Sequence, residues 1–209
     1  MASGAPRTTS SSAGYAKGQM RREQIVEAAV AAYADLGYHG ASLRKIAKRV
    51  GISHAGLIYY FPTREALLAA VLERRDVEDA ARGGLPQSPG LGVLRHLLDV
   101  AAHNQDHPAI VELYARLAAE AITPGHPAHG YFTRHYRQVR GYAAASFAAL
   151  AEAGQLRDGV DPETAAAALI ALMDGLQVQW LTDPGEVDLV GPLRLFLQQV
   201  LLVPVDQPQ

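Results

Sequence analysis

The chain has 209 residues, of which 49% are hydrophobic and 19% are charged, a composition that lies in the ordinary globular range and excludes wholesale disorder. It has no cysteine, which excludes a disulfide framework and a zinc finger. No apolar run approaches the roughly 18 residues that cross a bilayer, and the N-terminus has no apolar signal-peptide core. We therefore expect a soluble, cytoplasmic protein that has no membrane partner.

The net charge of −2 is divided unevenly along the chain. Residues 1–75 contain 11 Lys or Arg and 5 Asp or Glu, a net charge of +6, whereas residues 76–209 contain 8 and 16, a net charge of −8. One end of the molecule therefore suits a polyanion, and the other end would be repelled by it. This asymmetry predicts nucleic-acid binding through the N-terminal part of the chain.

The N-terminal segment predicts a tail followed by a helix. Residues 1–16 are rich in Ser, Thr, Ala and Gly and have no periodicity, which is typical of a disordered tail. An arm that reaches a minor groove is the alternative. Apolar residues then recur at helical spacing from about Lys17 to Leu36, and Gly37 is expected to end this helix.

The stretch Ala41 to Phe61 predicts two short helices joined by a tight turn. Ser42 is a good N-cap for the first helix, and Gly51 ends it, since glycine adopts the left-handed conformation without steric cost. Ser53 caps a second helix from about His54 to Tyr60. This arrangement matches the helix-turn-helix, whose second helix reads the major groove. An ordinary helical hairpin with a solvated basic face is the alternative.

The remainder of the chain predicts further helices and no strand or internal repeat. Thr63 caps a helix from about Arg64 to Arg82, and the Gly- and Pro-rich segment after it places a domain boundary near Gly83. Five more helical patterns follow, at about Leu91–Gln105, Ala109–Ala121, Tyr131–Ala153, Pro162–Leu181 and Val187–Val203. We predict an all-α protein with a tail (1–16), a three-helix DNA-binding domain (17–63), a connecting helix (64–83) and a C-terminal helical domain (84–209).

Two runs of sequence flank the turn. Ile25, Ala28 and Ala29 lead into YADLGYHGASLRKIAKRVGIS, and GLIYYFPTREALLAAVL follows. With these motifs, the stretch from Arg21 to Arg75 resembles the DNA-binding domain of the TetR family of bacterial transcriptional regulators. It departs from the family at Ile58, where an aromatic residue is usual, and at Pro62, where lysine is frequent.

The resemblance implies a ligand-responsive, homodimeric regulator, in the first place a repressor, without enzyme activity. It would bind a pseudo-palindromic operator in double-stranded DNA and leave it when a small-molecule effector binds. Ala55 and Gly56 would let the recognition helix approach base edges, and Tyr59 and Tyr60 would bond phosphates as their family counterparts do. The predicted DNA-binding residues are Ser42, Arg44, Lys48, His54, Ala55, Gly56, Tyr59, Tyr60 and Thr63.

The last two predicted helices are apolar around more than one face. Such a helix must bury more than one face, either as a central core helix or in a two-fold, four-helix interface. In the TetR family the C-terminal helix pair forms the dimer, so the resemblance favours an interface. The predicted interface residues are Leu169, Leu189, Leu193, Phe196, Leu197 and Val200.

The first four helices of the C-terminal domain are expected to enclose a cavity lined largely by apolar and aromatic side chains, which favours an apolar or aromatic effector. Asp174 interrupts an apolar run and needs a partner if it is buried. It would either pair with Arg116, Arg137 or Arg140, or face the cavity, where it would favour a cationic or hydroxylated compound. The predicted wall residues are Tyr114, Tyr136, Phe147, Asp174, Gln177 and Trp180.

Motifs for catalysis and metal binding are absent from the sequence. We find no nucleotide loop, nucleophile elbow or paired carboxylates. Pro108 breaks the helix that would align His103 with His107. The other clustered histidines are His126, His129 and His135. We predict neither a metal nor a cofactor. The rival hypotheses are an all-helical small-molecule-binding protein or enzyme with a structural N-terminal hairpin, and a helical interaction module that uses its apolar C-terminal face.

Overall fold

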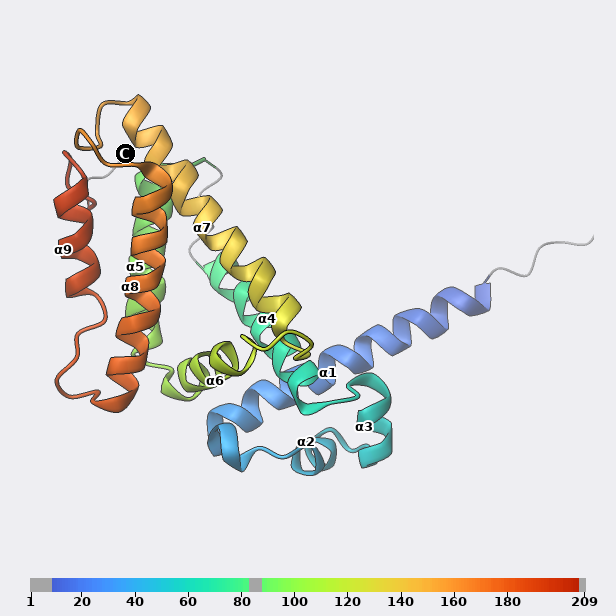
Figure 1. Cartoon of the computed structure of the whole chain (residues 1–209). Coiled ribbons are helices and arrows are strands. Elements are labelled where there is room, and N and C mark those ends of the chain that lie inside the picture. Colours follow the sequence, from blue (N-terminus) through green and yellow to red (C-terminus); the bar gives the residue numbers. More distant parts are fainter. Residues whose placement is uncertain (1–8, 83–87, 207–209) are drawn as a thin grey trace, which may run out of the picture.

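The structure is a computed structural model that describes residues 9–82 and 88–206, and its regular elements in this part of the chain are all α-helices (Figure 1). An isolated antiparallel bridge between Leu156 and Leu201 is the β-type pairing recorded there. The predicted all-α class is confirmed. The helices are α1 (Thr9–Gly40), α2 (Leu43–Val50), α3 (His54–Tyr60), α4 (Arg64–Arg82), α5 (Leu91–Asn104), α6 (Pro108–Glu120), α7 (His129–Glu152), α8 (Pro162–Thr182) and α9 (Gly191–Val200).

Helix α1 begins at Thr9, well before the predicted start at Lys17. The prediction of a disordered tail is therefore wrong for residues 9–16, while residues 1–8 lie outside the described part of the chain. Once a helix is nucleated, each further residue adds one backbone hydrogen bond without a new nucleus, and no proline interrupts this segment. Gly37, with φ 68° and ψ 177°, interrupts α1 at the predicted position.

The helix-turn-helix forms through local capping contacts. The Ser42 hydroxyl accepts a hydrogen bond from Lys45 N at 3.3 Å, and the Ser53 hydroxyl accepts one from Gly56 N at 3.0 Å. Gly51 lies in the left-handed region at φ 73°, where a side chain would be strained. These contacts confirm the predicted ends of α2 and α3. In each contact the donor and the acceptor are only a few residues apart in the sequence. The sequence was therefore sufficient to predict these helix ends.

Two hydrophobic cores organise the molecule. The first joins α1 to α4 and also contains Leu113 and Leu117 of α6 and Tyr131 and Phe132 of α7. The second is formed by α5, α7, α8 and α9, together with Val111 of α6. The N-terminal helices therefore rest on α6 and on the start of α7, and α4 is not their only connection to the rest of the protein.

Helix α9 is shorter than the predicted range of Val187–Val203. Before it, the Asp188 carboxylate accepts hydrogen bonds from Val190 N at 2.8 Å and Gly191 N at 3.0 Å, which forms a turn instead of helix. After it, Leu202 N donates to Gln155 O at 2.8 Å. The end of α9 is thus tied to the turn that follows α7.

The packing of α8 and α9 changes the predicted dimer interface. Leu169, Leu189, Leu193 and Leu197 are at most 1% exposed because they fill the core between helices of the same protomer. The prediction that these four contact a partner is therefore wrong for this conformation. Phe196 and Val200 are half-buried, and the large apolar side chains exposed on or beside these helices are Val178, Leu195 and Leu202.

Helix α8 is long and apolar enough to cross a membrane, with a mean hydropathy of 1.2 over its most apolar 18 residues. Charged residues such as Asp174 interrupt this helix, so it contains no uninterrupted apolar run of about 18 residues in the sequence. The side chains of Leu169, Ile170, Met173 and Trp180 lie in the second core. The apolar character of α8 thus has a structural role within the protomer.

Candidate nucleic-acid interface and ligand pocket

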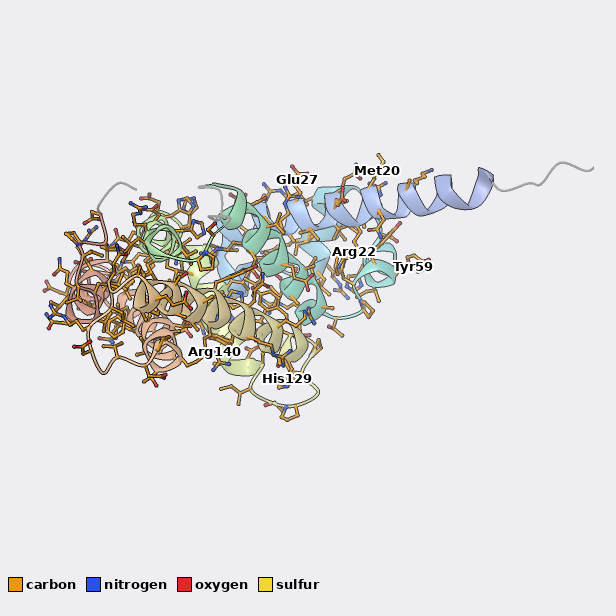
Figure 2. The ribbon with its side chains drawn as sticks, turned by 90° about the horizontal axis from the view of Figure 1, so that it is seen from above. Met20, Arg22, Glu27, Tyr59, His129 and Arg140 are labelled. Atoms are coloured by element: carbon orange, nitrogen blue, oxygen red, sulfur yellow. The ribbon has the colours of Figure 1, made fainter. Side chains whose placement is uncertain are left out.

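The helix-turn-helix presents most of the predicted DNA-binding residues to solvent. Tyr59 is 82% exposed and projects from α3 at the end of the molecule where α1 extends (Figure 2). Gly56 and Tyr60 are half-buried, and Tyr60 packs against the first core. The exposed members of the predicted set are Ser42, Arg44, Lys48, His54, Ala55, Tyr59 and Thr63.

The basic residues of α2 differ in their contacts. Lys45 donates to Gly40 O at 2.9 Å, and Arg49 forms an ion pair with Asp35 at 2.8 Å. Arg44 and Lys48 are exposed and form no ion pair recorded among the described residues. Arg44 and Lys48 therefore differ from Lys45 and Arg49, whose side chains have recorded partners within the protein.

Helix α1 adds cations that are not among the predicted DNA-binding residues. Lys17, Arg21 and Arg22 line a surface hollow together with Tyr59 and Tyr60. The Arg22 guanidinium lies 4.8 Å from the centre of the Phe61 ring, a cation–π contact that holds it beside α3 (Figure 2). The adjacent arginines were visible in the sequence, but only the fold brings them next to the recognition helix.

A cavity of about 180 Å³ lies between α4, α5, α6, α7 and α8. Three predicted residues, Tyr114, Asp174 and Gln177, lie in its wall. Phe147 and Trp180 are instead buried in the second core, and Tyr136 is half-buried against both cores and is not among the lining residues. The full lining is Leu72, Arg75, Asp76, Val93, His96, Leu97, Val100, Asn104, Tyr114, Tyr131, His135, Gln138, Val139, Tyr142, Ile170, Met173, Asp174 and Gln177.

Helix α4 contributes to this wall, which the sequence did not predict. Asp76 Oδ2 accepts a hydrogen bond from the Tyr131 hydroxyl at 2.8 Å and lies 3.1 Å from His135 Nδ1. Burial raises the pKa of Tyr131, and the neighbouring Asp76 carboxylate raises it further. We call Asp76, Tyr131 and His135 the Asp76 cluster. It joins the helix that carries the DNA-binding domain to α7.

Two further polar contacts hold α4. The Arg75 guanidinium donates to Oδ1 of Asn104, which is 1% exposed, and so links α4 to α5. Arg134 forms an ion pair with Glu73 at 3.0 Å, a second link to α7. Both partners of this ion pair are largely exposed, so it contributes at most about 1 kcal/mol. The position of α4 therefore depends more on the contacts in the cavity wall.

Asp174 has a tyrosine partner instead of an arginine. Tyr136 donates a hydrogen bond to it, and Tyr114 donates to Tyr136. Burial raises the pKa of Asp174, and the Tyr136 hydrogen bond and nearby His135 only partly oppose this rise. Burial likewise raises the pKa of Tyr136, to about 12.

The arginines considered for Asp174 lie elsewhere. Arg116 pairs with Glu112 at 2.8 Å, and the exposed Arg140 donates to the Tyr136 carbonyl at 3.1 Å (Figure 2). Arg137 is exposed on α7, where no contact with Asp174 is recorded. The hypothesis that Asp174 pairs with an arginine is therefore wrong. Asp174 lies in the cavity wall, as the alternative hypothesis expected.

Metal binding gains no support from the described residues, which contain no group of three or more His, Asp or Glu side chains able to hold an ion. His103 and His107 stack with ring centres 4.0 Å apart. His107 Nδ1 is 3.0 Å from the His103 carbonyl, and His129 Nδ1 is 2.8 Å from the Ala121 carbonyl. These imidazoles have structural partners.

Known families and relatives match both halves of the chain. Residues 25–71 match the model of bacterial regulatory proteins of the tetR family, and residues 93–197 match that of the C-terminal domain of BetI-type transcriptional repressors. The HTH-type transcriptional regulator PksA of Bacillus subtilis is 31% identical over 195 residues, which cover 87% of this chain and 89% of PksA. The chain belongs to the TetR family of bacterial transcriptional regulators.

A further relative and two solved structures match the chain over most of their own length. The transcriptional repressor AcnR of Corynebacterium diphtheriae is 26% identical over 170 residues, covering 81% of this chain and 85% of AcnR. The structure of SmeT in complex with triclosan superposes with a TM-score of 0.70 at 21% identity, covering 91% of this chain and 99% of SmeT. A structure reported as the molecular basis for control of antibiotic production by bacterial hormones has a TM-score of 0.66 at 27% identity. The match covers 86% of this chain and 97% of the chain in that structure.

As a TetR-family member, the protein is a DNA-binding transcriptional regulator and not an enzyme. The hypothesis of a purely structural N-terminal hairpin is therefore wrong. TetR-family regulators of this kind are in general cytoplasmic.

Proposed function

We propose that the protein is a homodimeric repressor that binds a pseudo-palindromic operator and is released by a small, largely apolar effector. The observation that carries this proposal is the exposed face of α2 and α3, where Arg44, Lys48 and Tyr59 are free to meet a phosphate backbone. Phosphate contacts of this kind fix the register of a recognition helix on DNA. Each protomer would place α3 in one major groove.

The proposed release follows from the position of α4. This helix carries the helix-turn-helix at one end and forms part of the cavity wall through Leu72, Arg75 and Asp76. An effector that changes the tilt of α4 would change the distance between the two recognition helices. Half-sites are about 34–36 Å apart, so a dimer whose heads no longer match them loses one of its two anchors.

The test is binding of the purified protein to short duplexes that contain its own upstream region, measured over a range of salt concentrations. We expect specific binding, with a sequence selected from random duplexes that is a pseudo-palindrome. Lys48→Ala should weaken binding to all sequences and lower the slope of log K against log salt by about one, because one phosphate contact is lost.

The matched control is Arg157→Ala, which removes a cation from an exposed turn after α7. This change should leave the salt slope as it is in the unsubstituted protein. A protein that binds no duplex at moderate salt, or Lys48→Ala and Arg157→Ala slopes that are equal, would contradict the proposed interface.

A further inference from the structure

The cavity wall contains more negative than positive formal charge. Asp76 from α4 and Asp174 from α8 both line it, and the Lys or Arg side chain among the lining residues is Arg75. The Arg75 guanidinium already donates to Asn104. With neutral histidines the wall therefore has a formal charge of −1, which favours a positively charged group over an anion.

The carboxylates of Asp76 and Asp174 can each accept further hydrogen bonds, or stronger ones than those recorded. The recorded donors to Asp76 are the Tyr131 hydroxyl and the His135 ring, and the recorded donor to Asp174 is the Tyr136 hydroxyl. A hydrogen bond in which both partners are ionised is roughly twice as strong as one between neutral groups. An ammonium N–H would therefore compete well with these donors.

The rest of the wall suits the body of such a ligand. The Tyr114, Tyr131 and Tyr142 rings can meet a cation, and apolar side chains cover most of the remaining surface. An apolar cavity of about 150 Å³ accommodates benzene. The cavity of about 180 Å³ therefore fits a body of about one aromatic ring; its apolar lining includes Val93, Leu97, Val100, Val139, Ile170 and Met173.

We propose that the effector is a protonated organic amine with an apolar body of about one ring, whose N–H groups bind Asp76 and Asp174. This inference rests on the proposed function, since it names the chemistry of the effector. A quaternary ammonium group has the same charge but no N–H donor, so it cannot replace the hydrogen bonds that Asp76 accepts. The site therefore selects primary and secondary amines over quaternary ones.

Recognition of the amine is also the signal. Asp76 belongs to α4, and its cluster partners Tyr131 and His135 belong to α7. When the amine takes the Asp76 carboxylate, it replaces contacts that join these two helices. Because α4 then keeps only its remaining contacts, such as Arg75–Asn104 and Arg134–Glu73, a change in its tilt costs less free energy.

The first test is titration calorimetry of the full chain without DNA, using phenethylamine and three analogues with the same ring. The analogues are phenethyltrimethylammonium, phenethyl alcohol and hydrocinnamate. Phenethylamine should bind at least about tenfold more tightly than each analogue, as expected for loss of a charge-assisted hydrogen bond. Asp76→Asn and Asp174→Asn should each weaken phenethylamine binding by roughly tenfold.

The matched control is Asp99→Asn on α5, because Asp99 is exposed and lies outside the lining set. Its phenethylamine affinity should equal that of the unsubstituted protein. Circular dichroism of each variant establishes that it is folded, and the four-ligand comparison on the unsubstituted protein decides the proposal even if one variant fails to fold.

The second measurement is operator affinity with and without saturating phenethylamine. Release of the operator supports both the amine and its route through α4. Equal binding of the alcohol or of the quaternary analogue, tighter binding of hydrocinnamate, or no binding of any probe overturns the amine proposal, even if the ligand-free protein binds its operator. Failure of the ligand-free protein to bind DNA overturns the proposed function instead.

Discussion

Tyr59 and Tyr60 are neighbours in the sequence but have different surroundings. Tyr59 is 82% exposed, whereas Tyr60 is half-buried against the first core, and their rings form an edge-to-face pair with centres 5.2 Å apart. Truncation of Tyr60 would therefore disturb packing as well as a phosphate contact. Tyr59 is the better residue for isolating the contribution of a hydroxyl group to DNA binding.

We predict that Tyr59→Phe weakens binding to operator and random duplexes alike, by about 10- to 150-fold, the value of one hydrogen bond to a charged group. A phosphate contact positions the helix without reading sequence, so the ratio of the two affinities should stay constant. Fluorescence anisotropy with both duplexes measures this. A change in the ratio would show that Tyr59 reads a base instead.

Asp174 is expected to make stability depend on pH. Burial raises its folded-state pKa above the ordinary value of 3.8, so the folded protein holds this proton more tightly than the unfolded chain. Below about pH 3.8 the carboxyl group therefore does not lower the free energy of unfolding. Its destabilising effect grows as the pH rises and is complete above the raised pKa. Asn at this position can still accept a hydrogen bond from Tyr136.

We predict that Asp174→Asn raises the melting temperature near neutral pH and that the gain shrinks as the pH is lowered towards 4. Thermal melts followed by circular dichroism at several pH values measure the difference between the two proteins. A gain that is the same at every pH, or a loss at neutral pH, would contradict the assigned cause of the raised pKa.

At the scale of the element, the recognition helix α3 is short, with seven residues from His54 to Tyr60. Such a helix depends on its cap and on tertiary packing, because short helices are marginal alone. The Ser53 hydroxyl accepts from Gly56 N, and a Cβ at Gly56 would lie 3.2 Å from that hydroxyl oxygen. The small residue after the turn thus leaves room for the cap.

We predict that Ser53→Ala lowers the free energy of unfolding by about 0.5–2 kcal/mol, because Gly56 N loses its acceptor. Urea denaturation provides the measurement. Ser53→Thr, which keeps a hydroxyl group at the cap, is the matched control and should retain most of the stability. Equal losses in both variants would mean that the side chain acts through packing and not as a cap.

At the scale of the whole molecule, the two faces of α8 and α9 have separate roles. The inward leucines build the protomer, while Val178 and Leu195 are 56% and 57% exposed. Exposed apolar side chains on this pair of helices fit the proposed homodimer, since a partner would remove them from water. The dimer surface is therefore expected to follow these residues and not Leu193.

We predict that the double variant Val178→Arg, Leu195→Arg stays folded but becomes monomeric in analytical ultracentrifugation, with much weaker operator binding. Leu193→Arg should instead unfold the protomer, because it places a charge in the second core. A double variant that still sediments as a dimer would place the interface on another surface.

The sequence by itself determined the local structure and the family. The ends of α2, α3 and α4 depend on the Ser42, Ser53 and Thr63 caps and on Gly51, and each of these contacts closes within about four residues. The same residues carry the resemblance to TetR regulators. Local contacts of this kind leave a readable pattern because the partners have a fixed spacing.

Only the tertiary structure decided which residues form the cavity and which are left for a partner. Asp76 meets Tyr131 and His135 across 55 and 59 positions of sequence, and Asp174 finds Tyr136 instead of an arginine. Likewise, equally apolar Leu193 and Leu195 end up inside and outside the protomer. The direction in which a helix faces depends on the helices packed against it, and no spacing along one segment encodes that arrangement.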